Sequence, residues 1–226
     1  MGYYPVLVDV TGQRCVVIGG GEVAEGKVAG LLEAGASVVV IAPKVTLRLR
    51  EWIAVGRVDH IPRNYQPGDL DGALLVISAT DDPVVNQAVW AEATAKGILV
   101  NVVDDPPRCR FIAPAVVRQG DLIIAISTSG KAPALAVRLR QWLERALGPE
   151  YARFLELVGP LRDPLLRRYP DLEERKRRWY RLVDSDVFAL LRAGDERTAR
   201  HRIHEILGLE EEQPIPVEVP ACVGEG

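Results

Sequence analysis

A glycine-rich segment placed directly after a short apolar run constrains the fold of this chain more than any other feature. Residues 14–18 are rich in valine, as expected of a buried strand, and Gly19-Gly20-Gly21-Glu22-Val23-Ala24 follows them without a gap. The segment matches G-x-G-x-x-A, in which the first glycine makes a tight turn and the second lets the backbone approach a diphosphate. The small final residue lets the helix pack close to the strand. The sequence therefore predicts a strand, a turn and a helix whose N-terminus binds a dinucleotide.

Short runs of valine and isoleucine alternate with segments of helical period through the rest of the first half, as in βαβ units around a parallel sheet. A first helix is expected to end at Gly35, and a second to run from Asp82-Pro83 to Gly97. The expected strands lie at residues 14–18, 37–41, 58–61, 74–79, 98–103 and 122–127. We predict the α/β class, with a Rossmann-type parallel sheet in the first domain.

The pattern changes after residue 127. An apolar stripe at helical spacing predicts a helix, and from Tyr151 onward helical periods continue without a convincing strand. Asp195 is expected to cap the last helix and Gly208 to end it. The stripe consists of Leu135, Leu139, Trp142, Leu143 and Ala146.

Composition excludes several classes of function. The formal net charge of -3 gives no overall attraction to nucleic acid or to an anionic membrane, and no apolar run approaches the roughly 20 residues that span a bilayer. The three cysteines, Cys15, Cys109 and Cys222, lie far apart, which argues against a zinc site or a disulfide framework and favours the cytoplasm. The three histidines are not spaced as a metal cluster, so no metal site is predicted.

Loops at the predicted carboxyl ends of the strands supply the remaining cofactor candidates. The acidic residue expected about 20 positions after the glycine turn, which would bind ribose hydroxyls, is replaced by Ile41-Ala42-Pro43-Lys44. The choice between NAD and NADP is therefore open, and Lys44 either contacts a 2′-phosphate or is an ordinary solvated lysine. Residues 79–82 and 101–105 are polar at two further strand ends, where capped turns are the alternative interpretation. The predicted cofactor contacts are Gly19, Gly21, Glu22, Val23, Ala42, Pro43, Lys44, Thr80, Asp81, Asn101 and Val103.

A polar turn, Ser127-Thr128-Ser129-Gly130-Lys131-Ala132, enters the helix that begins near Pro133. It fails as a phosphate-binding P-loop because Ala125 and Ala132 stand where that motif needs a glycine and a hydroxyl residue. The turn is expected instead to present backbone N–H groups and Lys131 to a carboxylate.

Taken together, these motifs resemble the dehydrogenase and chelatase module of siroheme synthase, which also occurs alone as precorrin-2 dehydrogenase. The resemblance implies NAD⁺-dependent oxidation of precorrin-2 to sirohydrochlorin, in some members followed by insertion of Fe²⁺, with Co²⁺ as another metal substrate to consider. It also implies a homodimer. The expected division is an NAD-binding domain over 1–112, a dimerisation and substrate-binding region over 113–149, a helical domain over 150–209 and a disordered tail over 210–226. The motifs that carry the resemblance are residues 17–24, 79–82 with Asn86, 101–104, 111–114 and 126–134.

The family that the chain resembles has a catalytic aspartate, and the resemblance implies that Asp104 is this residue. Its position after the fifth predicted strand suits a base beside the nicotinamide, and the alternative is a turn cap shared with Asp105. Arginines and a lysine near the last strand are candidates for binding substrate carboxylates, although a solvated face is the other explanation. The predicted substrate contacts are Ser127, Thr128, Ser129, Gly130, Lys131 and Arg138. Two competing functions stay open: an NAD-dependent oxidoreductase with another substrate, and an NAD-binding sensor that does not turn over.

Overall fold

The computed structural model describes residues 2–210 and divides the chain into two compact units, Met1–Ala113 and Pro114–Gly226. Each unit has its own buried cluster of apolar side chains. The finer division expected from the sequence stays a prediction. Apart from Glu210, the expected tail lies outside the described residues, and so does Cys222.

The first unit is built on a sheet of five parallel strands in the order β3-β2-β1-β4-β5. The chain runs outward from β1 to β3 and then crosses to β4 on the other side, so the order reverses beside β1. Ligands of such sheets bind where this reversal opens a crevice at the carboxyl ends of the strands. The prediction of a Rossmann-type sheet is confirmed, with two strands each shorter by one residue at both ends than expected. The strands are β1 (Arg14–Ile18), β2 (Ser37–Ile41), β3 (Val58–Ile61), β4 (Leu75–Ser78) and β5 (Leu99–Val102).

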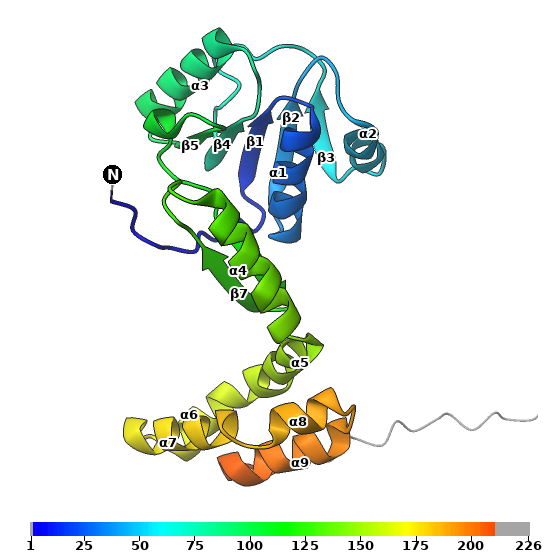
Figure 1. Ribbon diagram of the computed structural model, residues 1–226, viewed down its shortest axis with the longest axis vertical. Helices are drawn as coiled ribbons and strands as arrows, with labels where there is room; N and C mark the ends of the chain where they lie inside the picture. Colours follow the sequence, from blue (N-terminus) through cyan, green and yellow to red (C-terminus); the bar gives the residue numbers. More distant parts are fainter. Residues whose placement is uncertain (1, 211–226) are drawn as a thin grey trace, which may run out of the picture. The chain divides into compact units, whose positions relative to one another are not determined.

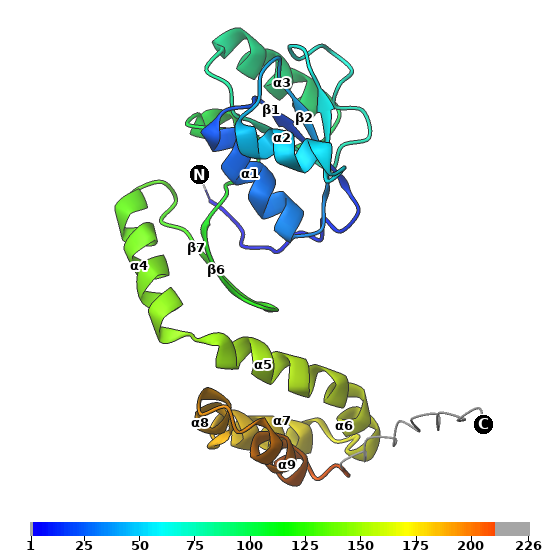
Figure 2. The ribbon, with the colours of Figure 1, turned by 90° about the vertical axis from the view of Figure 1, so that its right-hand side faces the viewer.

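Helices cover both faces of this sheet (Figures 1 and 2). Buried side chains of α1 (Glu22–Glu33) and α2 (Leu47–Ala54) join one apolar cluster, and those of α3 (Pro83–Ala95) join the cluster on the opposite face. The Asp82 carboxylate caps α3 as predicted, accepting a hydrogen bond from Val84 N at 2.8 Å. Helix α2 was not predicted, because it is only two turns long and has one fully buried side chain, Leu49.

The second unit opens with an antiparallel hairpin, on which α4 (Pro133–Ala146) packs. The hairpin joins β6 (Ala115–Gln119) to β7 (Leu122–Ile126), and only β7 was predicted. Strand β6 buries a single side chain, Val117, and so carries little of the pattern that signals a strand. The predicted apolar stripe of α4 is largely exposed, with Trp142 at 59%.

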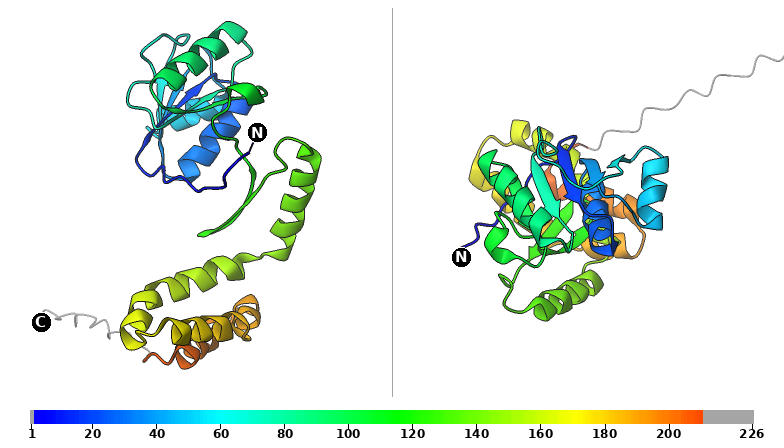
Figure 3. Two further views of the ribbon diagram at one scale, coloured as in Figure 1. Left: turned by 90° about the vertical axis from the view of Figure 1, so that its left-hand side faces the viewer. Right: turned by 90° about the horizontal axis from the view of Figure 1, so that it is seen from above.

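A cluster of short helices completes the second unit (Figure 3). As predicted, no strand follows Tyr151 within the described residues, and Asp195 and Gly208 bound the last helix. None of the described helices has the length and apolarity needed to cross a bilayer. The helices are α5 (Pro149–Val158), α6 (Arg162–Arg168), α7 (Leu172–Val183), α8 (Val187–Arg192) and α9 (Glu196–Leu207), with the 3₁₀ turn η2 (Gly159–Leu161) after α5.

An ion pair between α5 and α8 gives the helical cluster a pH-dependent contact. The Glu150 side chain is only 5% exposed, and Arg192 donates two hydrogen bonds to it, at 2.6 and 3.0 Å. Burial is the largest single influence and raises the pKa of Glu150, but the hydrogen bonds and charge of Arg192, together with backbone hydrogen bonds, outweigh it and hold the pKa below its ordinary value. The pair therefore stabilises the fold above the unfolded pKa of glutamate, and this contribution is lost as the pH falls through the lowered pKa.

Replacing Arg192 by methionine should lower the free energy of unfolding by about 1–2 kcal/mol at neutral pH, because it leaves a buried carboxylate unpaired. The expected loss of free energy is smaller than that for breaking an ion pair with both side chains buried, since the Arg192 side chain is 63% exposed. Urea unfolding at several pH values should show the difference from wild type shrinking in acid. Arg140→Met, which breaks an exposed pair with Glu144, is the control and should stay within about 0.5 kcal/mol. If the loss of unfolding free energy in Arg192→Met did not depend on pH, Arg192 would not be what lowers the pKa of Glu150.

Candidate functional site

The glycine turn after β1 is packed tightly on one side and open on the other. Gly19 has a φ of +115°, and a Cβ there would lie 2.2 Å from Ala79 O. A Cβ on Gly20 would lie 2.1 Å from Lys44 O. A Cβ on Gly21 would meet nothing within 4 Å. Gly19 and Gly20 therefore hold the turn against the neighbouring loops, while Gly21 leaves room for a ligand to approach the backbone.

The N-terminus of α1 is uncapped. Thr46 caps α2 and Asp82 caps α3 with a side-chain oxygen, whereas Gly21, at the cap position of α1, has no side chain to do so. The first-turn N–H groups of α1, which include those of Glu22 and Val23, are left for a ligand. Free N–H groups and the partial positive charge at this end of a helix suit a diphosphate.

A cavity of about 340 Å³ lies beside this turn, at the carboxyl ends of β1, β2 and β4. We call it the dinucleotide cavity. It gathers the predicted cofactor contacts from three separate loops, although Glu22 and Val23 are not part of its lining. The predicted contacts that line it are Gly19, Gly21, Ala42, Pro43, Lys44, Thr80 and Asp81.

Side-chain hydrogen bonds hold the loop after β4 in place. The buried Ser78 hydroxyl donates to Asn86 Oδ1 at 2.6 Å, and Asn86 Nδ2 donates to Thr80 O at 3.0 Å. The capped-turn interpretation of this segment is correct for Asp82. Asn86 thus fixes the wall of the dinucleotide cavity that carries Thr80 and Asp81.

A second cavity, of about 230 Å³, lies at the carboxyl end of β5, and we call it the aspartate cavity. Asp104 lines it with a φ of +60°, a left-handed conformation that is uncommon outside glycine and often marks functional sites. Its carboxylate makes no hydrogen bond or ion pair with any residue in the described part of the chain, so it does not cap a turn there. The Asp105 carboxylate, by contrast, is paired with Arg108. The lining consists of Lys27, Asn101, Val102, Val103, Asp104, Asp105, Pro106, Cys109, Ile112 and Ala113.

Two of these lining side chains are engaged in holding the loop after β5. Asn101 Nδ2 donates to Phe111 O at 3.0 Å, and the Cys109 thiol donates to Val102 O at 3.2 Å. Burial raises the pKa of Cys109, so the thiol stays protonated at neutral pH. The donor group of Asn101 is therefore already used, and its contact with a cofactor stays a prediction.

Three family models match consecutive parts of the chain. "Putative NAD(P)-binding" matches residues 6–115, "Sirohaem biosynthesis protein central" matches 119–146, and "Sirohaem synthase dimerisation region" matches 150–207. The chain belongs to the siroheme synthase N-terminal module family. The first match confirms the predicted NAD-type cofactor.

Curated siroheme synthases are similar along most of the chain. That of Chromobacterium violaceum is 40% identical over 200 residues, which cover 88% of this chain and 43% of the relative. Siroheme synthase 1 of Pectobacterium atrosepticum is 36% identical over 230 residues, covering 100% of this chain and 48% of the relative. The chain thus spans less than half the length of these relatives. Among solved structures, "SirC, precorrin-2 dehydrogenase" has a TM-score of 0.70 at 26% identity and covers 90% of this chain and 100% of its own.

In this member of the family the loop after β2 is basic. A cavity of about 480 Å³ adjoins the dinucleotide cavity through Pro43 and Lys44, and Arg50 and His60 also line it. No acidic residue lines this cavity. The place where a ribose-binding acid was expected therefore has basic character, and the contact of Lys44 with a 2′-phosphate stays a prediction.

The polar turn after β7 belongs to the second unit. Three of its six backbone N–H groups are engaged: Ser129 N donates to Ser127 Oγ, and Lys131 N and Ala132 N donate to Thr128. The other three N–H groups have no partner among the described residues, so the prediction that this turn offers its main chain to a carboxylate stays a prediction, and Lys131 is the cationic group that it provides. Arg138 hydrogen-bonds Gln141 on the same helix.

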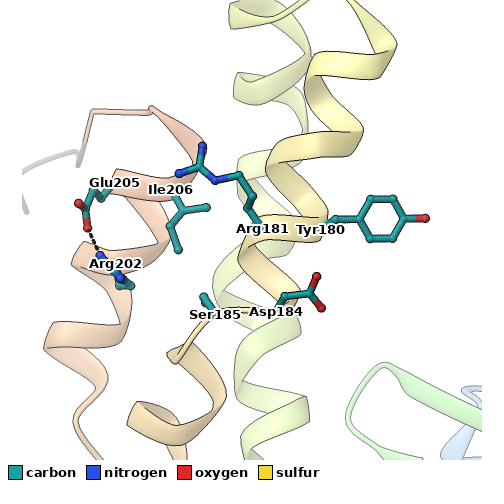
Figure 4. A pocket seen from close by; sticks show the side chains of 7 residues that line it. All are labelled: Tyr180, Arg181, Asp184, Ser185, Arg202, Glu205 and Ile206. Atoms are coloured by element: carbon teal, nitrogen blue, oxygen red, sulfur yellow. Dashed lines mark hydrogen bonds and ion pairs between the residues drawn. The ribbon is translucent and has the colours of Figure 1, made fainter.

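A cavity of about 500 Å³ lies between α7 and α9, and none of the predicted site residues lines it (Figure 4). Its charges are mixed, because Arg202 pairs with both Glu205 and Asp186. Within residues 2–210, no group of three or more histidine, cysteine or acidic side chains could hold a metal ion. We assign no ligand to this cavity. Its lining consists of Tyr180, Arg181, Asp184, Ser185, Arg202, Glu205 and Ile206.

Three residues that the structure places at the site are not among the predicted cofactor or substrate contacts. Gly20 is required by its close approach to Lys44 O, and Asn86 holds Thr80. Lys27, from the middle of α1, lines the aspartate cavity. No local signal identifies Lys27, since the cavity forms only when the end of β5 comes beside α1.

Proposed function

We propose that this chain oxidises precorrin-2 to sirohydrochlorin, with NAD⁺ as the hydride acceptor. The observation that carries the proposal is the unpaired Asp104 carboxylate at the same sheet edge as the open N-terminus of α1. The similarity to SirC, a precorrin-2 dehydrogenase that the chain covers over its full length, supports the same substrate.

In this proposal the dinucleotide cavity binds the cofactor, and the aspartate cavity supplies the base. The oxidation removes one hydride and one proton from the macrocycle, and bound NAD⁺ supplies the acceptor for the hydride. The first-turn N–H groups of α1 bind the diphosphate, while Thr80 and Asp81 line the other wall of the dinucleotide cavity. Asp104 accepts the proton, and both of its carboxylate oxygens are available because no residue between 2 and 210 pairs with them. Ser127–Gly130, Lys131 and Arg138 are the proposed contacts for the carboxylates of the tetrapyrrole.

An anaerobic turnover assay tests this function against its alternatives. Purified protein with NAD⁺ and enzymatically generated precorrin-2 should produce NADH and sirohydrochlorin in equal amounts. A sensor module would bind NAD⁺ without reducing it. An oxidoreductase for another substrate would leave precorrin-2 unchanged, and either result would refute the proposal.

The proposal includes metal insertion into sirohydrochlorin as a second activity. Entry of the metal releases two pyrrole protons, and Asp104, unpaired among residues 2–210, can accept them one at a time and pass each to solvent. Adding Fe²⁺ or Co²⁺ after the oxidation should change the absorbance spectrum to that of the metallated product faster than in a protein-free control. Equal rates would confine the chain to the oxidation.

We further propose that the chain acts as a homodimer in the cytoplasm, where its free thiols Cys15 and Cys109 suit a reducing compartment. The match to a dimerisation region and the exposed apolar side chains of α4 support self-association. Trp142→Glu should therefore shift the mass measured by light scattering from dimer to monomer. Arg140→Glu, on the same helix, replaces a positive by a negative charge without removing an exposed apolar side chain and should leave the dimer intact. If Trp142→Glu stayed dimeric, the exposed apolar face of α4 would not be the dimer interface.

A further inference from the structure

The aspartate cavity contains a cation that the proposed mechanism does not use. Lys27 lines it from α1, five residues after the first residue of the helix, whereas the other lining residues come from the end of β5 and the loop that follows. Lys27 is half-buried and lines the cavity. A lysine in such a place can pack its aliphatic stem along the protein and extend its ammonium group into the cavity.

The Lys27 ammonium is unpaired. It makes no ion pair or hydrogen bond with any residue between 2 and 210, although Asp104 and Asp105 line the same cavity. Asp105 is already neutralised by Arg108. The cavity thus holds one free anion, the proposed base, and one free cation.

These two charges suit the substrate class proposed above. A polycarboxylate tetrapyrrole would be repelled by Asp104 if nothing nearby compensated its charge. An ammonium group in the same cavity can instead bind one peripheral carboxylate of the ring and so fix the ring carbons relative to the base.

We propose that Lys27 is the substrate-positioning residue of this site, binding a peripheral carboxylate of the tetrapyrrole beside Asp104. The inference rests on the proposed function, because it takes the substrate class from it. It adds a contact from the first unit to those proposed from the polar turn and α4.

The test compares Lys27→Met and Lys27→Arg with wild type in two assays. The first measures kcat and KM for precorrin-2, and the second measures the Kd for sirohydrochlorin by fluorescence without turnover. Lys27→Met should raise both KM and Kd by about tenfold or more, the loss expected for one charge-assisted hydrogen bond. Lys27→Arg should recover most of this loss, because it keeps the charge. The Kd for NAD⁺ should not change in either variant.

Lys44→Met is the matched control, since it removes a lysine from the dinucleotide cavity and should spare the affinity for sirohydrochlorin. Unchanged KM and Kd in Lys27→Met, with an active wild type, would overturn the role of Lys27 and leave the proposed function standing. A weakened NAD⁺ affinity, or a shifted pH profile of kcat/KM at constant Kd, would overturn it too, since Lys27 would then act on the cofactor or on Asp104. A wild type that neither binds sirohydrochlorin nor oxidises precorrin-2 would overturn both.

Discussion

Replacing Asp104 by asparagine is expected to lower kcat for precorrin-2 oxidation by about 10²–10⁴-fold, the range typical of losing a general base. Asparagine has nearly the same shape and tolerates the left-handed conformation, with a φ of +60°, that the chain adopts there. The fold and the affinity for NAD⁺ should therefore be retained. Stopped-flow measurement of NADH formation, with calorimetric titration of NAD⁺, checks both parts of this expectation.

Asp105→Asn is the matched control for that variant. Its carboxylate is one residue away and lines the same cavity, but it is paired with Arg108 and so is not available as a base. We expect kcat to stay within about threefold of wild type, since the change affects only a partly exposed ion pair. If Asp105→Asn were the inactive variant and Asp104→Asn the active one, the assignment of the base would be wrong.

The second large effect should come from alanine substitutions in the glycine turn, which separate folding from binding. In Gly19→Ala the new Cβ would lie 2.2 Å from Ala79 O on a backbone with φ of +115°. Overpacking and left-handed strain together should lower the free energy of unfolding by about 3 kcal/mol or more. Chemical denaturation measures this loss directly.

Gly21→Ala should leave stability within about 0.5 kcal/mol of wild type, because its Cβ meets nothing within 4 Å and its φ of -83° suits any residue. The methyl group would instead occupy the side from which the diphosphate approaches the backbone. Calorimetry should show NAD⁺ affinity reduced by about tenfold or more. If Gly21→Ala bound NAD⁺ as tightly as wild type does, the diphosphate would not bind at this turn.

The sequence predicted the parts of the fold whose signal is local. Strands β1 and β2 are continuous apolar runs, Asp82-Pro83 marks the start of α3, and the glycine turn has a fixed spacing to the strand before it. Helix α2 and strand β6 were missed because each buries one side chain, which leaves almost no periodic pattern.

The site was predictable only where a single segment carries its chemistry. The glycine turn and Asp104 stand at strand ends, so the topology alone brings them to one edge of the sheet. Lys27 depends on contact between segments far apart in the chain, and the engagement of the amides after Ser127 depends on turn geometry. Neither relation is encoded in local spacing.

Isotope transfer tests the central claim most directly. Precorrin-2 carrying deuterium at the ring carbon that loses the hydride would be oxidised by the purified chain with unlabelled NAD⁺, and the NADH formed would be analysed by mass spectrometry. Deuterium should appear in NADH in proportion to the sirohydrochlorin produced. Sirohydrochlorin formed with unlabelled NADH, or with no NADH, would contradict the claim.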